Sequence, residues 1–399
     1  MSEPSPGSSC RLLDLRGLDR TALETLVAEL GGERYRAAQI LRWLHRQQIA
    51  SVDEMRNLPA ALRAALAGRG ALRTVELEQA QQAADGAVKL RWRLHDGEQI
   101  ESVFIPDAAR AGRHALCIST QVGCAMGCTF CATATLKLRR HLLASEIVEQ
   151  VRKANLWLAS GEHATASGVL SPAFPVSQAQ RGPQPAPPLR RSSGSARKSS
   201  PVQAEARIGS IVLMGMGEPL HNYGATVAAL RILTDPDGHG YSPRRVTVST
   251  VGLIEPLRRL LDDVDVQIAV SLVAARPEVR RKLIPADRQN PVADLLAACA
   301  ALPIKRRRRI TFEVVLIAGV NDGDDDARAL ARAVAPLRCK VNLIPYNPHP
   351  LASFAPPDAA RVEEFQGILR AMNVGVYLRQ PRGQEIAAAC GMLVAQHRS

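Results

Sequence analysis

The chain of 399 residues is 46% hydrophobic and carries a formal net charge of +13 at pH 7. This length and composition suffice for a barrel-sized core with a small accessory domain, and the lack of a long uninterrupted apolar run excludes a membrane-spanning protein. Residues 1–17 lack an apolar signal core and the scattered cysteines do not form a secreted disulfide framework, so we expect a cytoplasmic protein without membrane contacts. The basic excess favours a polyanionic partner such as nucleic acid.

The N-terminal part of the chain predicts two segments. Residues 1–19 are rich in Ser, Pro and Gly and are expected to be a disordered N-terminus. Residues 20–70 carry apolar residues at helical spacing, interrupted at Gly31-Gly32 and before Pro59, which predicts a small helical accessory domain that binds RNA. The sequence leaves open whether its arginines contact RNA or form a solvated face; they are Arg34, Arg36, Arg42 and Arg46.

Residues 71–110 alternate polar and apolar side chains around two turns, Asp85-Gly86 and Asp96-Gly97. Such alternation around Asp-Gly turns is typical of β-hairpins. We therefore predict a β-hairpin extension between the helical domain and the core.

Residues 111–395 repeat a strand followed by a helix. Strands are predicted at 115–119, 208–213, 245–250, 266–272, 310–316 and 339–344, and helices at 144–158, 224–234, 254–263, 292–301, 325–335 and 359–372. These units indicate a parallel sheet with helices outside it, either an open barrel or a doubly wound sheet. Residues 160–206 interrupt the pattern with Ser, Pro, Gly, Ala and Gln, which predicts a disordered low-complexity insertion, with a basic RNA-grasping arm as the alternative.

Cys124, Cys128 and Cys131 have C-x3-C-x2-C spacing on a loop of small residues that follows the first predicted core strand. Thiolates that converge from a tight loop suit a [4Fe–4S] cluster, and three of them leave one iron open for another molecule. The alternatives are a zinc site, for which the sequence offers no obvious fourth ligand, and cysteines that only pack. Reaction centres of parallel barrels lie at the carboxyl ends of strands, where this loop would be.

With its flanks, Ser119–Gly123 and Thr129–Thr133, this motif resembles the RlmN/Cfr family of radical S-adenosylmethionine (SAM) RNA adenine methyltransferases, most closely the branch that methylates adenine C2. The resemblance covers residues 20 to 395 outside the insertion. It implies an α/β fold with a radical SAM partial (β/α)6 barrel, a [4Fe–4S] cluster and two SAM molecules per turnover. It further implies 23S rRNA as substrate, tRNA (the adenosine 3′ of the anticodon) as a second one, and an electron donor such as flavodoxin or ferredoxin. We expect a monomer.

The resemblance assigns the cofactor positions. Cys124, Cys128 and Cys131 would hold the cluster, and Gly217 and Glu218, in a Gly-Met-Gly-Glu-Pro turn after a predicted strand, would hold SAM. Glycine suits this turn because it lets the backbone approach a ligand closely. Further matches to SAM-binding positions are Ser249, Ser271, Leu272, Val273 and Asn347, although singly such strand-end residues are more typical of turns and caps. Val273 stands where the family usually has histidine, and Ala134 and Lys137-Leu138 also depart from its pattern.

The resemblance also assigns three catalytic residues. Cys390 would take a methyl group from one SAM, and a 5′-deoxyadenosyl radical from a second SAM would abstract hydrogen from that S-methyl group. The methylene radical would add to adenine, and Cys117 would release the methylated RNA by forming a disulfide with Cys390. Glu101 would accept the ring proton, although a glutamate on an alternating strand is expected to face solvent.

Three basic clusters remain: Lys137 with Arg139-Arg140, Arg280-Arg281-Lys282, and Lys305–Arg309. They contact RNA phosphates or form solvated loops. The functional alternatives to C2 methylation are methylation of adenine C8 by the same machinery, a divergent paralogue that binds RNA without this activity, and a radical SAM enzyme acting on a small molecule.

Overall fold

The computed structural model describes residues 12–47, 49–107, 114–161 and 207–395. Within them a ten-stranded sheet has the order β14-β13-β12-β11-β10-β9-β6-β5-β4-β3. The strands are β3 (Glu76–Gln82), β4 (Val88–Arg93), β5 (Gln99–Ile105), β6 (His114–Cys117), β9 (Ile208–Leu213), β10 (Val246–Thr250), β11 (Gln267–Ser271), β12 (Ile310–Leu316), β13 (Cys339–Pro345) and β14 (Val376–Leu378). Within this sheet, β6 and the strands from β9 to β14 pair in parallel, and β3 to β6 pair antiparallel.

The strand order decides between the two predicted architectures. Each parallel strand lies beside the next one in the chain, and the order never reverses. A doubly wound sheet would reverse direction at a switch point, so the sheet is wound in one direction, as in a partial barrel. The predicted α/β fold class is confirmed, and the predicted hairpin strands extend the same sheet.

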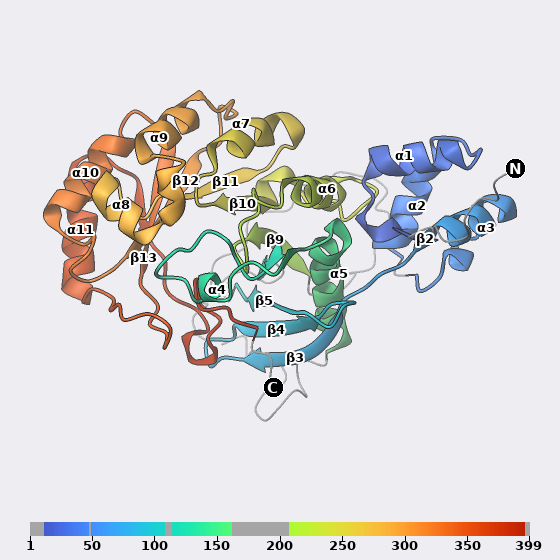
Figure 1. Cartoon of the computed structure of the whole chain (residues 1–399), viewed down its shortest axis with the longest axis horizontal. Coiled ribbons are helices and arrows are strands. Elements are labelled where there is room, and N and C mark those ends of the chain that lie inside the picture. Colours follow the sequence, from blue (N-terminus) through green and yellow to red (C-terminus); the bar gives the residue numbers. More distant parts are fainter. Residues whose placement is uncertain (1–11, 48, 108–113, 162–206, 396–399) are drawn as a thin grey trace, which may run out of the picture.

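Helices connect the parallel strands on the outside of the sheet (Figure 1). They are α5 (Ala144–Ser160), α6 (Tyr223–Thr234), α7 (Ile254–Asp263), α8 (Pro277–Leu283), α9 (Val292–Ala301), α10 (Asp324–Val334) and α11 (Ala359–Ala371). Each buries an apolar stripe; α7, for example, buries Ile254, Leu257 and Leu260. The predicted strand and helix positions are confirmed, while α8 and β14 were not predicted. No described helix has the length and apolar character needed to cross a membrane.

The N-terminal helices α1 (Arg20–Glu29), α2 (Arg36–His45) and α3 (Ala60–Arg69) pack around a hydrophobic cluster of their own. The expectation of disorder is wrong for residues 12–19. There, β1 (Leu13–Asp14) pairs with β2 (Gly70–Ala71), and Leu15 is fully buried. Residues 1–11, and residues 162–206 of the predicted insertion, lie outside the described residues.

Charged side chains in the N-terminal part of the chain contact the core. Arg16 is buried and its Nη1 lies 2.9 Å from Glu149 Oε2 on α5. On α2, Arg42 Nε lies 2.6 Å from Asp237 Oδ1. Arg46 Nε donates to the carbonyl of Gly238 at 3.0 Å. Arg36 Nη1 donates to Gln39 Oε1 at 2.8 Å, so three of the four arginines considered for RNA contact are engaged within the protein.

Candidate active site

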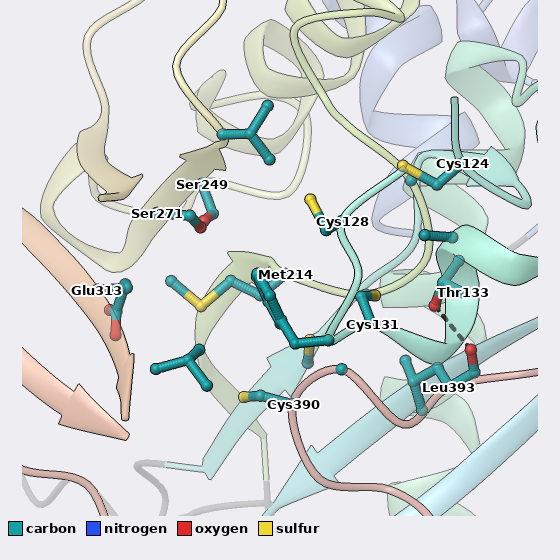
Figure 2. A pocket seen from close by; sticks show the side chains of 18 of the residues that line it. Cys124, Cys128, Cys131, Thr133, Met214, Ser249, Ser271, Glu313, Cys390 and Leu393 are labelled. Atoms are coloured by element: carbon teal, nitrogen blue, oxygen red, sulfur yellow. Dashed lines mark hydrogen bonds between the residues drawn. The ribbon is translucent and has the colours of Figure 1, made fainter. Parts of the chain in front are cut away.

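A cavity opens where the parallel strands end. Thiols, hydroxyls, carboxylates and apolar side chains line it together, which is typical of a cofactor pocket. Its walls come from the cysteine loop after β6, the ends of β9 to β13, and the C-terminal segment (residues 384–395). Figure 2 shows Cys124, Cys128 and Cys131 on one side, Ser249, Ser271 and Glu313 on the other, Met214 between them and Cys390 near the C-terminal segment.

The cysteine loop brings all three predicted ligands to this cavity. Its fold depends on Gly123, whose φ of 75° lies in the left-handed region and whose Cβ, if present, would overlap the carbonyl oxygen of Lys137 at 1.7 Å. Burial raises the pKa of Cys124 to about 12. It also raises the thiol pKa of Cys128 and of Cys131.

The donor set fits a cluster better than a single metal ion. Among the described residues, no group of three or more His, Cys, Asp or Glu side chains is positioned to hold one ion. A [4Fe–4S] cluster places its thiolates on different irons, so it needs thiols spread around a cavity, as Cys124, Cys128 and Cys131 are. Thiolate ligation also compensates for the burial of these side chains.

The glycine turn after β9 lies beside the segment that leads into the cysteine loop, and the amide of Thr120 donates to Met216 O at 2.9 Å. Gly217 has a φ of 99°, and a Cβ there would lie 2.5 Å from the Cβ of Gln121, so only glycine fits. The Glu218 side chain lines the cavity, and the backbone amides of Leu220 and Val251 donate to its oxygens at 3.1 and 2.9 Å. Burial raises the pKa of Glu218 to about 7, against the lowering effect of these hydrogen bonds.

This raised pKa makes a prediction for stability. Between the unfolded value of 4.5 and the folded value of about 7, the folded protein holds the Glu218 proton more tightly than the unfolded chain does. The free energy of unfolding of the ligand-free protein should therefore fall as pH rises through this window, by about 3 kcal/mol in total. Urea unfolding at several pH values measures the slope, and Glu218→Gln, which cannot titrate, should flatten it. Equal slopes in the two proteins would contradict the assignment.

Four of the five other predicted cofactor positions line the cavity: Ser249, Ser271, Val273 and Asn347. Leu272 does not, because its side chain packs into the main hydrophobic core. Val273 has a φ of 61°, which is rare and strained for a β-branched residue. Its backbone is held by N–H donation to Glu313 O and by acceptance from Asn321 Nδ2.

The predicted cysteine pair also faces this cavity. Cys117, at the carboxyl end of β6, is buried, whereas Cys390 is exposed to the cavity, and both are free thiols. Burial raises the pKa of Cys117 to about 12, and the nearby Cys390 contributes to the rise. Desolvation within the cavity also raises the pKa of Cys390, while the charge of Arg379 lowers it.

The backbone around Cys390 is fixed to the rest of the site. Asn347 Nδ2 donates to the carbonyl of Cys390 at 3.1 Å, and the amide of Ala132 donates to Gly391 O at 2.7 Å. Thr133 Oγ1 donates to Leu393 O at 2.7 Å (Figure 2). The loop that carries the three candidate ligands therefore also positions the thiol at residue 390.

Glu101 lies elsewhere. Its side chain is 3% exposed, so the expectation that it faces solvent is wrong. It faces a second cavity on the other side of the C-terminal segment, where Lys89 Nζ lies 3.6 Å from its Oε1. Burial raises the pKa of Glu101, against the charges of Lys89 and Arg91.

Sequence reasoning missed Glu313. This residue lines the catalytic cavity on β12, in register with Ser271 on one side and Asn342 on the other. Asn342 Nδ2 donates to its Oε1 at 3.0 Å, whereas its Oε2 is buried without a hydrogen-bond partner among the described residues. Such an oxygen can accept a hydrogen bond from a ligand. The signal in the sequence was a lone glutamate inside the apolar run Ile310–Leu316.

The basic clusters are partly structural. Arg280 is 1% exposed, pairs with Asp287 at 3.0 Å and donates to the carbonyls of Val251 and Ser271. It therefore holds two strand ends of the site and cannot contact a phosphate. In the run Lys305–Arg309, Lys305 and Arg308 pair with Asp265. That run precedes β12, at the end of the strand opposite the cavity.

Comparisons with known proteins identify the family of the chain. Residues 13–71 match the model of the ribosomal RNA large subunit methyltransferase N-terminal domain. The chain is 43% identical over 386 residues (96% of this chain, 92% of the relative) to a dual-specificity RNA methyltransferase RlmN of Anaeromyxobacter dehalogenans. It is 40% identical to RlmN 2 of Myxococcus xanthus (98% and 94% covered).

Among solved structures, a radical SAM methyltransferase from Sphaerobacter thermophilus superposes with a TM-score of 0.77 at 38% identity, covering 96% of this chain and 100% of that one. The fold, the full-length similarity and the cysteine loop lead to one family. The chain belongs to the RlmN family of radical SAM RNA methyltransferases.

Proposed function

We propose that this protein methylates C2 of adenine in 23S rRNA and of the adenosine 3′ of the anticodon in tRNA, through an S-methylated Cys390. The observation that carries this proposal is that Cys117 and Cys390 line the same cavity as the three candidate cluster ligands. The names of the relatives, dual-specificity RNA methyltransferases, support an RNA substrate. The basic excess of +13 suits a partner whose affinity depends on phosphate neutralisation.

The residues that line the cavity would bind two cofactors. Cys124, Cys128 and Cys131 would hold a [4Fe–4S] cluster, and Gly217, Glu218, Ser249, Ser271, Val273 and Asn347 would bind SAM, with Leu272 contributing only its backbone. When bound, these cofactors supply the methyl group and the reducing power for radical chemistry.

Two thiols and one carboxylate of the chain would carry out the methyl transfer, the release of the product and the removal of the ring proton. Cys390 acts as the nucleophile that carries the methyl group, and its exposure to the cavity gives it access to both cofactor and substrate. Cys117, buried and with a thiol pKa near 12, keeps its proton until it attacks the sulfur of Cys390 and frees the product. Glu101, whose pKa is raised by burial, would accept the proton of the adenine ring.

The reaction would also depend on an electron donor and on the place of the protein in the cell. Reduction of the cluster calls for an external electron donor such as flavodoxin or ferredoxin. The protein would act as a monomer in the cytoplasm, where ribosomes and tRNA are found.

Nucleoside mass spectrometry tests the reaction. The protein is expressed in a host that lacks this methylation, and rRNA and tRNA are digested to nucleosides. We expect 2-methyladenosine in both pools, and none when Cys390→Ala is expressed instead. Appearance of 8-methyladenosine would show that the enzyme methylates C8 instead of C2. Absence of both 2-methyladenosine and 8-methyladenosine, while the purified protein still cleaves SAM, would refute an RNA adenine substrate.

A further inference from the structure

A second cavity lies beside the catalytic one, between the sheet and the C-terminal segment. Six of its nine lining residues are polar or charged, which suits a polar ligand. From the sheet it is lined by Gln79, Gln81, Lys89, Arg91 and Glu101. Of these side chains, only Glu101 has a role in the proposed reaction.

The floor of the second cavity continues into the catalytic one. Strand pairing places Gln79, Arg91 and Glu101 in one row across β3, β4 and β5. The next row contains Gln81, Lys89 and Val103, and Val103 lines the catalytic cavity. Residues two apart on a strand share a face, so a ligand lying on this face can reach from one cavity to the other.

The proposed chemistry needs such a ligand. Glu101 opens into the second cavity and Cys390 into the first, with the C-terminal segment between them. An adenine that reaches both groups must lie at their boundary. Because SAM has to occupy the catalytic cavity, the nucleotides attached to that adenine are left with the second cavity.

The cations of the second cavity are held only in long ion pairs. Lys89 Nζ lies 3.6 Å from Glu101, and Arg91 Nε lies 3.6 Å from Glu78, beyond normal hydrogen-bond distance. Arg91 Nε is buried and makes no hydrogen bond among the described residues. A buried donor of this kind is costly unless a ligand satisfies it.

The carboxylates of the cavity oppose an anion only weakly. Glu385, on the C-terminal segment, accepts a hydrogen bond from the amide of Ala84 and so faces the β3–β4 turn. Glu101 lies 3.6 Å from Lys89 Nζ, so its charge is offset within that pair. A phosphate in this cavity would meet Lys89 and Arg91 on the side formed by the sheet.

We propose that the second cavity binds the RNA backbone next to the target adenosine, with Lys89 and Arg91 contacting phosphate oxygens and Gln79 and Gln81 contacting the neighbouring nucleotide. Amide side chains suit this place because they both donate to and accept from base edges. The inference rests on the proposed function in naming RNA as the ligand.

The test uses three single variants of the full-length protein: Lys89→Gln, Arg91→Gln and Arg93→Gln. Arg93 is a matched control, since it follows on the same face of β4 but pairs with Glu76 outside the cavity. Binding of a fluorescent RNA hairpin with an adenosine in its loop is measured between 50 and 200 mM salt. For Lys89→Gln and Arg91→Gln we expect the Kd to rise about tenfold and the slope of log Kd against log salt to fall by about 1, with Arg93→Gln unchanged.

A second readout separates this subsite from the catalytic centre. Methylation of Cys390 by SAM without RNA, followed by intact-protein mass spectrometry, should be the same in all variants. Unchanged RNA affinity in Lys89→Gln and Arg91→Gln, an equal loss in Arg93→Gln, or a parallel loss of Cys390 methylation would each overturn the proposal. If RNA from the expression host carried no methyladenosine while Arg91→Gln still weakened RNA binding, the proposed reaction would fail and the subsite would stand.

Discussion

Replacement of Cys390 by alanine should abolish RNA methylation while the protein still assembles its cluster. The proposed reaction passes through the sulfur of Cys390, and loss of a catalytic nucleophile lowers turnover by at least about 10³-fold. The backbone of the segment should stay in place, because Asn347 and Ala132 bind the carbonyls of residues 390 and 391 rather than the thiol. Nucleoside mass spectrometry measures the methyladenosine, and iron content with the visible absorbance of the reconstituted protein measures the cluster.

Cys339→Ala is the matched control for this loss. Cys339 is a free, partly buried thiol at the start of β13, at the end of the sheet opposite the cavity, and it should be replaceable with full activity. If Cys390→Ala produced 2-methyladenosine above a tenth of the wild-type amount, the methyl group would not be transferred by way of this residue. Loss of iron from the variant would instead point to a ligand role for Cys390.

The barrel could be predicted from the sequence because the pattern that predicts each strand or helix lies within a single short segment. The run Ile310–Leu316 is apolar and followed by a loop, and α7 repeats apolar residues at helical spacing, so both elements were placed correctly. Helix α8 was missed because its central residue, Arg280, looked like part of a surface cluster. Only its partners Asp287, Val251 and Ser271, which belong to other segments, reveal that it is buried.

The site was harder to predict where its environment comes from distant parts of the chain. The alternation on β5 predicted an exposed Glu101, but the C-terminal segment, nearly 300 residues later, covers that face. Likewise, Leu272 was carried over with its neighbours, although strand alternation turns its side chain into the core. Residues 12–19 looked like a flexible start, but pairing of β1 with β2, burial of Leu15 and the Arg16–Glu149 ion pair order them.

Replacement of Cys117 by alanine should leave the first steps intact and stop the last. Cys390 can still take the methyl group and join it to adenine, but no second thiol remains to attack its sulfur. In the wild-type protein that attack forms the S–S bond and breaks the S–CH2 bond. The electron pair of the broken bond stays on the carbon bound to adenine, which takes up a proton, equivalent to the one that the Cys117 thiol loses, and becomes the methyl group. The variant should therefore accumulate a covalent protein–RNA adduct, with turnover reduced by at least about 10³-fold.

A denaturing gel with labelled RNA detects this adduct as a band that survives heat and urea and disappears after protease digestion. The double variant Cys117→Ala with Cys390→Ala should form none, because it lacks the sulfur that joins protein to RNA. The small volume change at a buried strand end lowers stability, so the folded fraction is checked by circular dichroism. Free methylated RNA at the wild-type rate from Cys117→Ala would show that the buried thiol at the end of β6 is not the resolving group, even though it shares the cavity with Cys390.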